Sequence, residues 1–569
     1  MSSYQCLLRS VVVSVLLTAG TCASLAPQPG NQQPSASGSG TLGDIARKYR
    51  GEKSTTAPAP APVAPQKSLG EYAAAQRATK HAEVLLTEKD AAELMKELSE
   101  ITDFASGDTG YPEHAVVKHR IVGQDDVKRH WSEALSGSAE AQRLARSELV
   151  LKKFGYLPKD FTLKKYLIDN SADSIAGFYD FQTKTMNLVN WVSLDHQRPI
   201  MAHELTHALQ DQNFNLMAWE RRAEPRSRNS GMQVNADEGQ ESDARRAVIE
   251  GQAMVVFLDY TLKPYGRTLA DTPSAIDFIN GRMTESYDNS LVIHNAPLIF
   301  KDSAIFPYRE GLMFELELLK KGGVQQAFAE AFAHPPADTH QILDPKAYFS
   351  GEKIPPVIIP DLSGILSPQY QPYDNGTIGQ LDVRVMSEQF GTENDMFTIT
   401  PGWKGGSYVA VKRAAAGNDV NLGTADIGLV YVSRWKDAES AERFAELYRK
   451  SLSKRLTVAD ETRLDGRACA EHQCALWSTR VNTNEGMVFI EIWPDHTVFI
   501  THSLPEEKVA QLRARVLLHE PQTKSAVHVQ EVSERVQNLP GFQAFREQAE
   551  WDFMEQIFKP DKSNDSIRF

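Results

Sequence analysis

Basic residues are in the minority in this chain of 569 residues, where 61 Lys and Arg stand against 74 Asp and Glu and give a net charge of −13. Non-specific binding of nucleic acid needs a basic face, so this balance argues against a nucleic-acid partner. Long apolar runs are also missing. After the N-terminal region, no stretch approaches the roughly 18 apolar residues of a membrane span, so we expect no membrane-spanning helix.

The N-terminus has the layout of a secretory signal peptide. Arg9 precedes a mostly apolar run from Val11 to Ala19, and small residues follow, with Thr21 to Ala23 as a cleavage site. We predict a signal peptide over residues 1–23 and an exported protein, periplasmic or extracellular. The segment TAGTC also resembles a lipoprotein cleavage box. In that case Cys22 would carry a lipid anchor, although a threonine before the cysteine suits this box poorly.

Cysteine is scarce, with four residues in the whole chain, of which Cys6 and Cys22 belong to the N-terminal region. The remaining Cys469 and Cys474 lie close together in RACAEHQCALW, and no second pair exists to complete a zinc knuckle. In an exported protein, two such thiols are more often a loop staple than a metal site. We therefore predict a small disulfide between them.

Composition divides the rest of the chain into segments. Residues 24–68 are dominated by Pro, Ala, Ser, Gly and Gln, cannot bury enough apolar surface to fold, and predict a disordered tether. Helical periodicity follows and predicts a mostly helical domain over residues 69–370. Residues 371–520 contain strand-like runs around one amphipathic helix and predict a separate α+β domain. Residues 521–569 predict a polar helical tail. The expected fold class is therefore α+β.

The segment PIMAHELTHALQDQ, at 199–212, carries a metal-binding spacing. His203 and His207 are four residues apart on a predicted helix, so both imidazoles point the same way and can reach one ion. Catalytic Zn²⁺ sites have three protein ligands and one open position. Glu204 can take the proton of a water that attacks a carbonyl polarised by the metal. The alternative is an ordinary amphipathic helix with two surface histidines.

Glu250 is the predicted third ligand. It interrupts the apolar run VIEGQAMVVFL at 248–258, where an unpaired buried carboxylate would be costly and metal coordination would remove the cost. Other readings stay open: an ion pair with Arg245 or Arg246, or a bend that exposes the side chain. The rival ligands in the preceding polar stretch are Glu238, Glu241 and Asp243, the last of which could instead support a ligand from behind.

HELTHALQD resembles the active-site helix of the thermolysin-type gluzincins, including Asp211. It is still more similar to a group of exported bacterial proteins of minimal gluzincin type, in which a helix with Glu-Gly-x-Ala follows, here at 250–253. GFYDFQTKTMNLV, FPYREGLMF and HPPADTHQILDPKAY also match, so the resemblance spans roughly residues 150–350. It implies a zincin-like catalytic domain and a zinc metallopeptidase, with His203, His207 and Glu250 as ligands and Glu204 as the base.

The chain also departs from the thermolysin pattern. Thermolysin has its glutamate much nearer the second histidine and an aspartate four residues later that orients a ligand. Here the third ligand lies 43 residues on, from 207 to 250, and the later position holds Met254. The histidines must be oriented from elsewhere, and Asp211 and Asp243 are the candidates. In the closer group we expect Glu where this chain has His340.

Such a site also needs a donor for the developing oxyanion, usually Tyr or His. The candidates are Tyr308, which we prefer, and His334 and His340; a packing role is the alternative for Tyr308. IAGFYDFQTKTMNLV, at 175–189, predicts a hairpin. We expect Lys184–Val189 to be an edge strand that aligns an extended peptide, with Tyr179 and Asn187 binding the peptide backbone.

These features predict an exported zinc metallopeptidase that acts on a peptide or protein substrate. Two other functions would use the same residues. A zinc amidase acting on cell-wall peptides would rely on the same water chemistry. A non-enzymatic cell-envelope protein would keep the zinc as a structural or vestigial site and bind a partner through residues 371–520.

Overall fold

The computed structural model places all the residues it describes in one compact unit, within residues 69–569. It describes residues 88–518 and single positions of the C-terminal tail; the gaps before 518 are 124–125, 127–137, 164, 167–176, 193, 222–231, 233–240, 272–295, 417–421, 465, 467 and 471–472. The tail positions are 536–537, 542–543, 545–547, 549–550 and 554. The expected signal peptide, tether and lipid anchor at Cys22 lie outside these residues. No described helix is long and apolar enough to cross a membrane.

A three-stranded sheet precedes the helix that carries the histidine motif. Its order is β1 (Lys118–Val122), β3 (Thr185–Val189), β2 (Gly177–Asp180), with β1 parallel and β2 antiparallel to β3. The predicted hairpin is thus confirmed as β2–β3. Its turn is closed by Asp180, whose Oδ1 accepts from the backbone N–H of Gln182 at 2.8 Å.

The prediction of an edge strand at Lys184–Val189 is wrong. Lys184–Val189 corresponds to β3, which is the central strand, because β1 pairs with its other side. Patterning did not predict β1, since its sequence KHRIV lacks alternation and only its last residue is buried. Among the described strands, the edge that faces away from β1 is β2.

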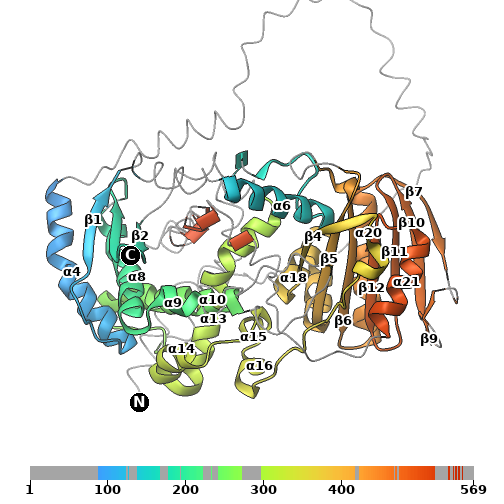
Figure 1. The fold of residues 1–569 in the computed structure, drawn as a ribbon. Coiled ribbons are helices and arrows are strands. Elements are labelled where there is room, and N and C mark those ends of the chain that lie inside the picture. Colours follow the sequence, from blue (N-terminus) through green and yellow to red (C-terminus); the bar gives the residue numbers. More distant parts are fainter. Residues whose placement is uncertain are drawn as a thin grey trace, which may run out of the picture. The chain divides into compact units, whose positions relative to one another are not determined.

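Four long helices form the part of the fold that carries the histidine motif (Figure 1). The motif lies on α8 (Leu194–Phe214), which starts just after β3 and packs against α4 (Glu88–Thr109) and α10 (Glu241–Leu262). α13 (Leu298–Val324) crosses α10. The other helical elements here are α6 (Ser138–Phe154), α9 (Leu216–Arg221), η1 (Lys263–Tyr265), η2 (Gln325–Glu330), α14 (Ala331–Ala333), α15 (Thr339–Leu343), α16 (Pro345–Ser350) and α17 (Ser363–Leu366).

The α10–α13 crossing brings two backbones into direct contact. A Cβ on Gly251 would lie 2.4 Å from the carbonyl of Gly311, and a Cβ on Gly311 would lie 2.2 Å from the carbonyl oxygen of Ala247. Real side chains cannot approach a backbone so closely, so only glycine fits at both positions. Glu250 precedes the first glycine and Tyr308 lies one turn before the second, so this contact sets the spacing of two candidate site residues.

A seven-stranded antiparallel sheet fills the C-terminal half, in the order β4-β5-β6-β12-β11-β10-β7. Its strands are β4 (Tyr370–Thr377), β5 (Trp403–Arg413), β6 (Ile427–Trp435), β7 (Val458–Arg463), β10 (Trp477–Thr483), β11 (Gly486–Ile492) and β12 (Thr497–His502). The helical elements are α18 (Gln380–Phe390), α19 (Glu393–Ile399), η3 (Thr400–Gly402), η5 (Thr424–Asp426), α20 (Ala438–Arg455) and α21 (Glu506–Leu517). The expected α+β character is confirmed at this level, while the zincin-like identity of the helical part stays a prediction.

Both faces of this sheet are buried, and successive side chains of each strand alternate between them. One face belongs to the core shared with the helical part, through Tyr408, Ala410, Leu429, Tyr431, Val498 and Ile500. The other face forms a second core with α17 and α21, through Val409, Val411, Val430, Val432, Phe489 and Phe499. The predicted disulfide is confirmed: Cys469 and Cys474 are bonded across the small hairpin of β8 (Cys469–Ala470) and β9 (Gln473–Cys474).

We predict that Gly251→Ala lowers the free energy of unfolding by about 2 kcal/mol or more, because the added methyl forces α10 and α13 apart. Gly107→Ala is the matched control. Gly107 is also helical, but a Cβ there meets nothing within 4 Å. That change should be neutral or stabilise the protein by up to about 1 kcal/mol. Urea unfolding followed by circular dichroism measures both, and equal midpoints for the two variants would contradict the close crossing.

Candidate metal centre

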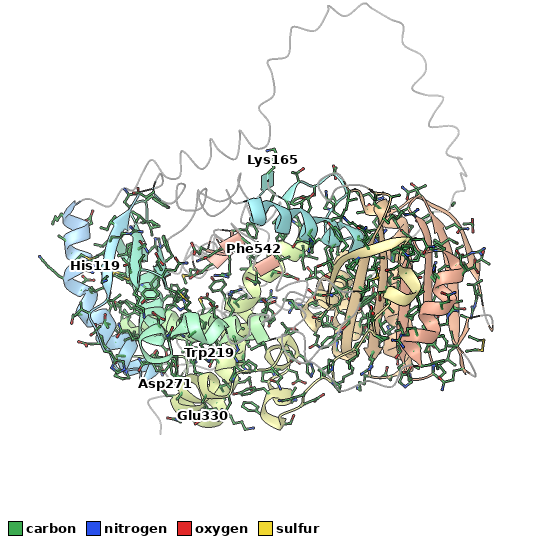
Figure 2. The ribbon with its side chains drawn as sticks, in the orientation of Figure 1. His119, Lys165, Trp219, Asp271, Glu330 and Phe542 are labelled. Atoms are coloured by element: carbon green, nitrogen blue, oxygen red, sulfur yellow. A yellow bond between two sulfur atoms is a disulfide. The ribbon has the colours of Figure 1, made fainter. Side chains whose placement is uncertain are left out.

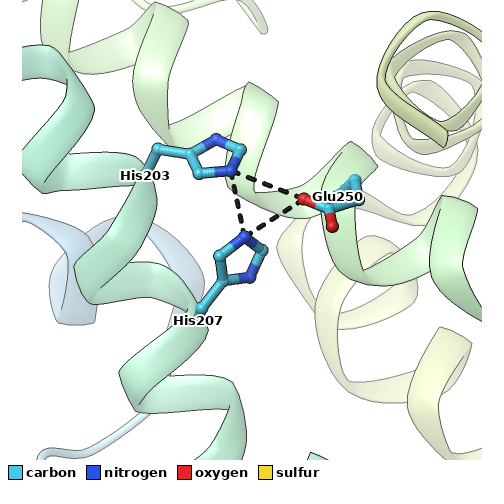
Figure 3. A group of neighbouring side chains, drawn as sticks. All are labelled: His203, His207 and Glu250. Carbon is cyan, nitrogen blue, oxygen red and sulfur yellow. Dashed lines mark hydrogen bonds and ion pairs between the residues drawn. The ribbon is translucent and has the colours of Figure 1, made fainter. Parts of the chain in front are cut away.

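Three ligand atoms from α8 and α10 converge in the core (Figure 3). His203 Nε2 and His207 Nε2 lie 2.9 Å apart. Glu250 Oε2 lies 3.1 Å from the His207 nitrogen and 3.5 Å from the His203 nitrogen. All three residues are buried. The two histidines share a face because they are four residues apart on α8, and Glu250 meets them because α10 packs along that face.

These atoms fit a metal ion. Ligand atoms of a tetrahedral zinc ion stand about 3.4 Å apart at the usual bond lengths, close to the three distances observed. Within the described part of the chain, Glu250 Oε2 is buried and makes no hydrogen bond, although it faces two ring nitrogens. Three converging acceptor atoms repel one another unless a cation lies among them. The cluster could therefore hold a metal ion, whose identity it does not define.

The electrostatics of the cluster agree with this fit. Burial lowers the pKa of His203 to about 4, so its ring is neutral and can offer a lone pair. Burial alone would lower the pKa of His207, but the charge of Glu250 raises it above the ordinary value. Burial would likewise raise the pKa of Glu250, yet His207 and His203 hold it well below the usual range. Glu250 is therefore an anion, as a metal ligand must be.

A chain of amides fixes the tautomer of His207. The amide nitrogen of Gln210 donates to the backbone carbonyl of Ile249 at 3.1 Å and to Gln252 Oε1 at 3.0 Å. This leaves Gln210 Oε1 as the acceptor for His207 Nδ1, at 2.9 Å. The proton of the ring is therefore on Nδ1, and Nε2 presents a lone pair to the cluster. Gln252 is held in turn, since its own nitrogen donates to the carbonyl of Ala327 at 2.9 Å.

Sequence reasoning missed this role for Gln210 and assigned it to Asp211 or Asp243. Asp211 instead braces the sheet: it accepts from Tyr179 Oη at 3.2 Å and from the backbone N–H of Leu216 at 3.0 Å. Asp243 is buried on α10, two turns before the third ligand. The available signal was spacing, because Gln210 lies three residues after His207 and therefore on the same face of α8.

The structure also bears on the alternative interpretations of Glu250. The side chain is 7% exposed, so no bend carries it to the surface. Arg245 stacks on Trp219, at 4.5 Å from the ring centre, and Arg246 lies 3.6 Å from Glu220. Of the rival ligands, Glu238 and the side chain of Glu241 lie outside what the structure describes.

Glu204 is buried beside the cluster, at 3% exposure. β2 packs against it: a Cβ on Gly177 would be 3.7 Å from Glu204 Cγ, an ordinary contact distance. The backbone N–H of Tyr179 donates to the carboxylate. Burial first, and then the charges of Glu250 and Glu547, raise the pKa of Glu204 well above its ordinary value. A raised pKa makes a carboxylate a better acceptor for a proton from water.

Of the three candidate oxyanion donors, Tyr308 alone lines the pocket of the cluster. Its hydroxyl stays protonated, since burial and nearby carboxylates raise its pKa well above 10.0. His334 is on the surface and pairs with Glu330 at 3.2 Å. His340 is buried in a different cavity of about 610 Å³, where its Nδ1 lies 2.8 Å from Gln380 Oε1.

Tyr179 and Asn187, the two hairpin residues expected to bind substrate, have different surroundings. Tyr179 lines the pocket, next to Gly177 and Phe178 of the same strand. Asn187 does not line it. Its amide nitrogen donates to the backbone carbonyls of Phe178 at 3.3 Å and Thr185 at 3.0 Å, inside the sheet. Asn187 therefore holds the hairpin together, and the structure does not support the expected contact with a substrate.

The C-terminal tail also lines this pocket, which sequence reasoning did not foresee. Gln543, Arg546, Glu547 and Glu550, all helical, contribute to its wall. Glu550 Oε1 lies 3.0 Å from His203 Nε2. Glu550 also forms a second potential metal-binding group with His203 and Glu204. The tail thus adds a candidate oxygen ligand that the motif on α8 did not predict.

The comparison with known proteins finds a match only in the C-terminal half of the chain. A family model described as a domain of unknown function (DUF8575) matches residues 369–513, which contain all seven strands of the large sheet. The metal cluster on α8 and α10 lies outside the match. No curated protein and no solved structure matches the chain. The function of the site therefore has to be argued from its geometry and chemistry.

We predict that Gln210→Ala weakens metal binding by about 10–100-fold, because the His207 ring loses the partner that fixes its tautomer. Competition with a chromophoric chelator measures the dissociation constant. Gln182→Ala is the control, since Gln182 is an exposed glutamine in the hairpin turn. The two variants should differ in affinity while their unfolding midpoints stay comparable. Equal affinities would show that the ring is oriented without Gln210.

Proposed function

We propose that this protein is a zinc metallopeptidase of the gluzincin type. One observation carries the proposal: three buried ligand atoms, within 3.5 Å of one another, adjoin a buried glutamate from the same helix turn. His203, His207 and Glu250 supply three protein ligands, the number found in catalytic zinc sites. A site of this kind has a use for Glu204 only if a water has to lose a proton there.

Each residue then has a role in peptide hydrolysis. A zinc ion held by the three ligands would polarise the scissile carbonyl and acidify a water. Glu204 takes the proton of the attacking water and later passes it to the leaving amine. Tyr308 donates its hydroxyl hydrogen to the oxygen on which negative charge develops. Gln210 keeps the His207 ring in the tautomer that binds metal.

β2 is the strand best suited to align a substrate. It has a free edge among the described strands, and its residues Gly177 to Tyr179 line the pocket. An extended peptide can add to such an edge by backbone hydrogen bonds, which accept many sequences. For this reason we assign to β2 the alignment of an extended peptide, which the sequence predicted for Lys184–Val189. The signal-peptide prediction places the activity outside the cytoplasm.

A structural zinc site is the second candidate. Glu550 favours it, because its oxygen lies 3.0 Å from His203 Nε2 and adds a further candidate protein ligand beside His203 and Glu204. Structural zinc sites are closed in this way, whereas catalytic ones keep one position open. In that case the chain would be an envelope protein that binds a partner through another surface. The buried Glu204 beside the ligands has no part in this alternative.

We predict that Glu204→Gln keeps about one zinc ion per chain and loses hydrolysis by a factor of about 10² or more, because only the base is removed. Glu250→Ala should lose both the zinc and the activity. Zinc content is measured by atomic absorption, and hydrolysis with a casein-type peptide. Glu442 is an exposed glutamate on α20, and Glu442→Gln is the control for removing one charge. Unchanged hydrolysis by Glu204→Gln would refute the mechanism.

We further predict that Tyr308→Phe lowers kcat by about 10²–10³-fold without changing KM or zinc content, since the hydroxyl acts on charge that develops in the transition state. Tyr265→Phe tests the loss of an exposed hydroxyl, as Tyr265 is 61% exposed. Steady-state kinetics on both variants separate the two parameters. A rise in KM alone would assign Tyr308 to substrate binding instead.

A further inference from the structure

The described tail residues form a helical segment with two faces. Phe542, Phe545 and Ala549 are buried and apolar, and they recur at spacings of three and four. Phe542 and Phe545 pack on Phe300 of α13, with ring centroids 5.7 and 6.2 Å away. Phe542 is labelled in Figure 2. This apolar face anchors the segment. The opposite face carries the four polar residues that line the metal pocket.

Glu550 contacts the same groups that a reacting peptide would have to contact. Its Oε1 lies 3.0 Å from His203 Nε2. The hydroxyl of Tyr308 donates to its carboxylate. Its oxygen, one of the Glu204 carboxylate and His203 nitrogen all lie within 4.8 Å of one another. A carboxylate in this place therefore contacts the metal side, the base and the oxyanion donor together.

The segment also leaves little space. With the tail in place, the pocket bounded by β2, α8, α10 and α13 has a volume of about 30 Å³. This volume admits a water molecule or two and excludes a peptide. Four of the residues that bound this space belong to the tail, so displacing the tail would enlarge it.

The charges around Glu550 point to a cation. Four carboxyl groups line the pocket, those of Glu204, Glu250, Glu547 and Glu550, against the single guanidinium of Arg546. A divalent ion beside these oxygens offsets the repulsion and favours the ionised form.

We propose that Glu550 is a further ligand on the His203 and Glu204 side of the metal centre, in the place a reacting water needs, and that the C-terminal segment keeps the enzyme latent until it is displaced. The inference rests on the proposed peptidase function and adds its regulation. The segment belongs to the same chain, so it competes with substrate at a high effective concentration. Its anchor is a few apolar residues on α13, which a cut in the tail would release.

The test compares full-length proteins that carry single changes. Glu550→Gln removes the ligand charge, and Phe545→Ala loosens the anchor without touching the pocket. Glu442→Gln is the charge control, and a Glu204→Gln/Glu550→Gln double variant reports background hydrolysis. Each protein is loaded with Co²⁺ for its visible spectrum, titrated with a zinc chelator, and assayed on a casein-type peptide. Circular dichroism verifies that each variant is folded.

Three results are expected. Glu550→Gln shifts the Co²⁺ spectrum and weakens zinc binding about tenfold or more, as loss of a ligand should. Hydrolysis by Glu550→Gln and by Phe545→Ala rises about tenfold or more over the unmutated chain, because the open form becomes populated. The double variant stays inactive, which ties the gained activity to Glu204.

The contrary results separate the two proposals. A Co²⁺ spectrum and a zinc affinity unchanged by Glu550→Gln would overturn the assignment of Glu550 as a metal ligand. Full hydrolysis by the unmutated chain would overturn latency and leave the peptidase standing. A shifted spectrum without hydrolysis in any variant would overturn latency too, and would identify a closed structural site instead of a peptidase. Absence of bound metal from every protein would refute both proposals.

Discussion

The arrangement of this protein depends on carboxylates buried between helices that are otherwise apolar. α10 is nearly all apolar around Glu250, and α8 buries Glu204 just as deeply. An ionised carboxylate in such surroundings is strongly destabilising unless an opposite charge compensates it. The two histidines compensate only one of these groups, and Arg546 is the one guanidinium in the pocket wall. A metal ion is the compensation that suits the geometry, because it neutralises several oxygens and nitrogens at one point.

The polar groups around the cluster are fixed by backbone atoms. Gln210 takes its orientation from the carbonyl of Ile249, and Gln252 takes its own from the carbonyl of Ala327. Tyr111 adds a further contact, since its hydroxyl lies 3.0 Å from Gln252 Oε1. Such a network is stable only when all its members are satisfied. It therefore holds the His207 ring in one orientation before any metal arrives, which reduces the entropy that binding has to overcome.

Sequence patterns could predict the parts of the site that obey local rules. The spacing of His203 and His207 follows from the helical period, and Glu250 is conspicuous as a charge in an apolar run. β1 could not be predicted, because its short charged sequence becomes a strand only by pairing with β3. Glu550 could not be predicted either. Its position depends on Phe542 and Phe545 finding Phe300, a contact between distant segments that no local period encodes.

The seven-stranded sheet is tied to the metal centre through charged contacts at α13 and α6. Arg384 of α18 lies 2.7 Å from Glu310, two residues after Tyr308, and with Arg309 it lowers the pKa of Glu310 to about 2 although burial opposes this. Lys153 of α6 is buried against Glu485, at 3.1 Å. Removing one partner of a buried ion pair costs about 3–5 kcal/mol, because the other charge stays unpaired. Separating the sheet from the helices would expose or orphan these groups. The sheet therefore supports the helix that carries Tyr308.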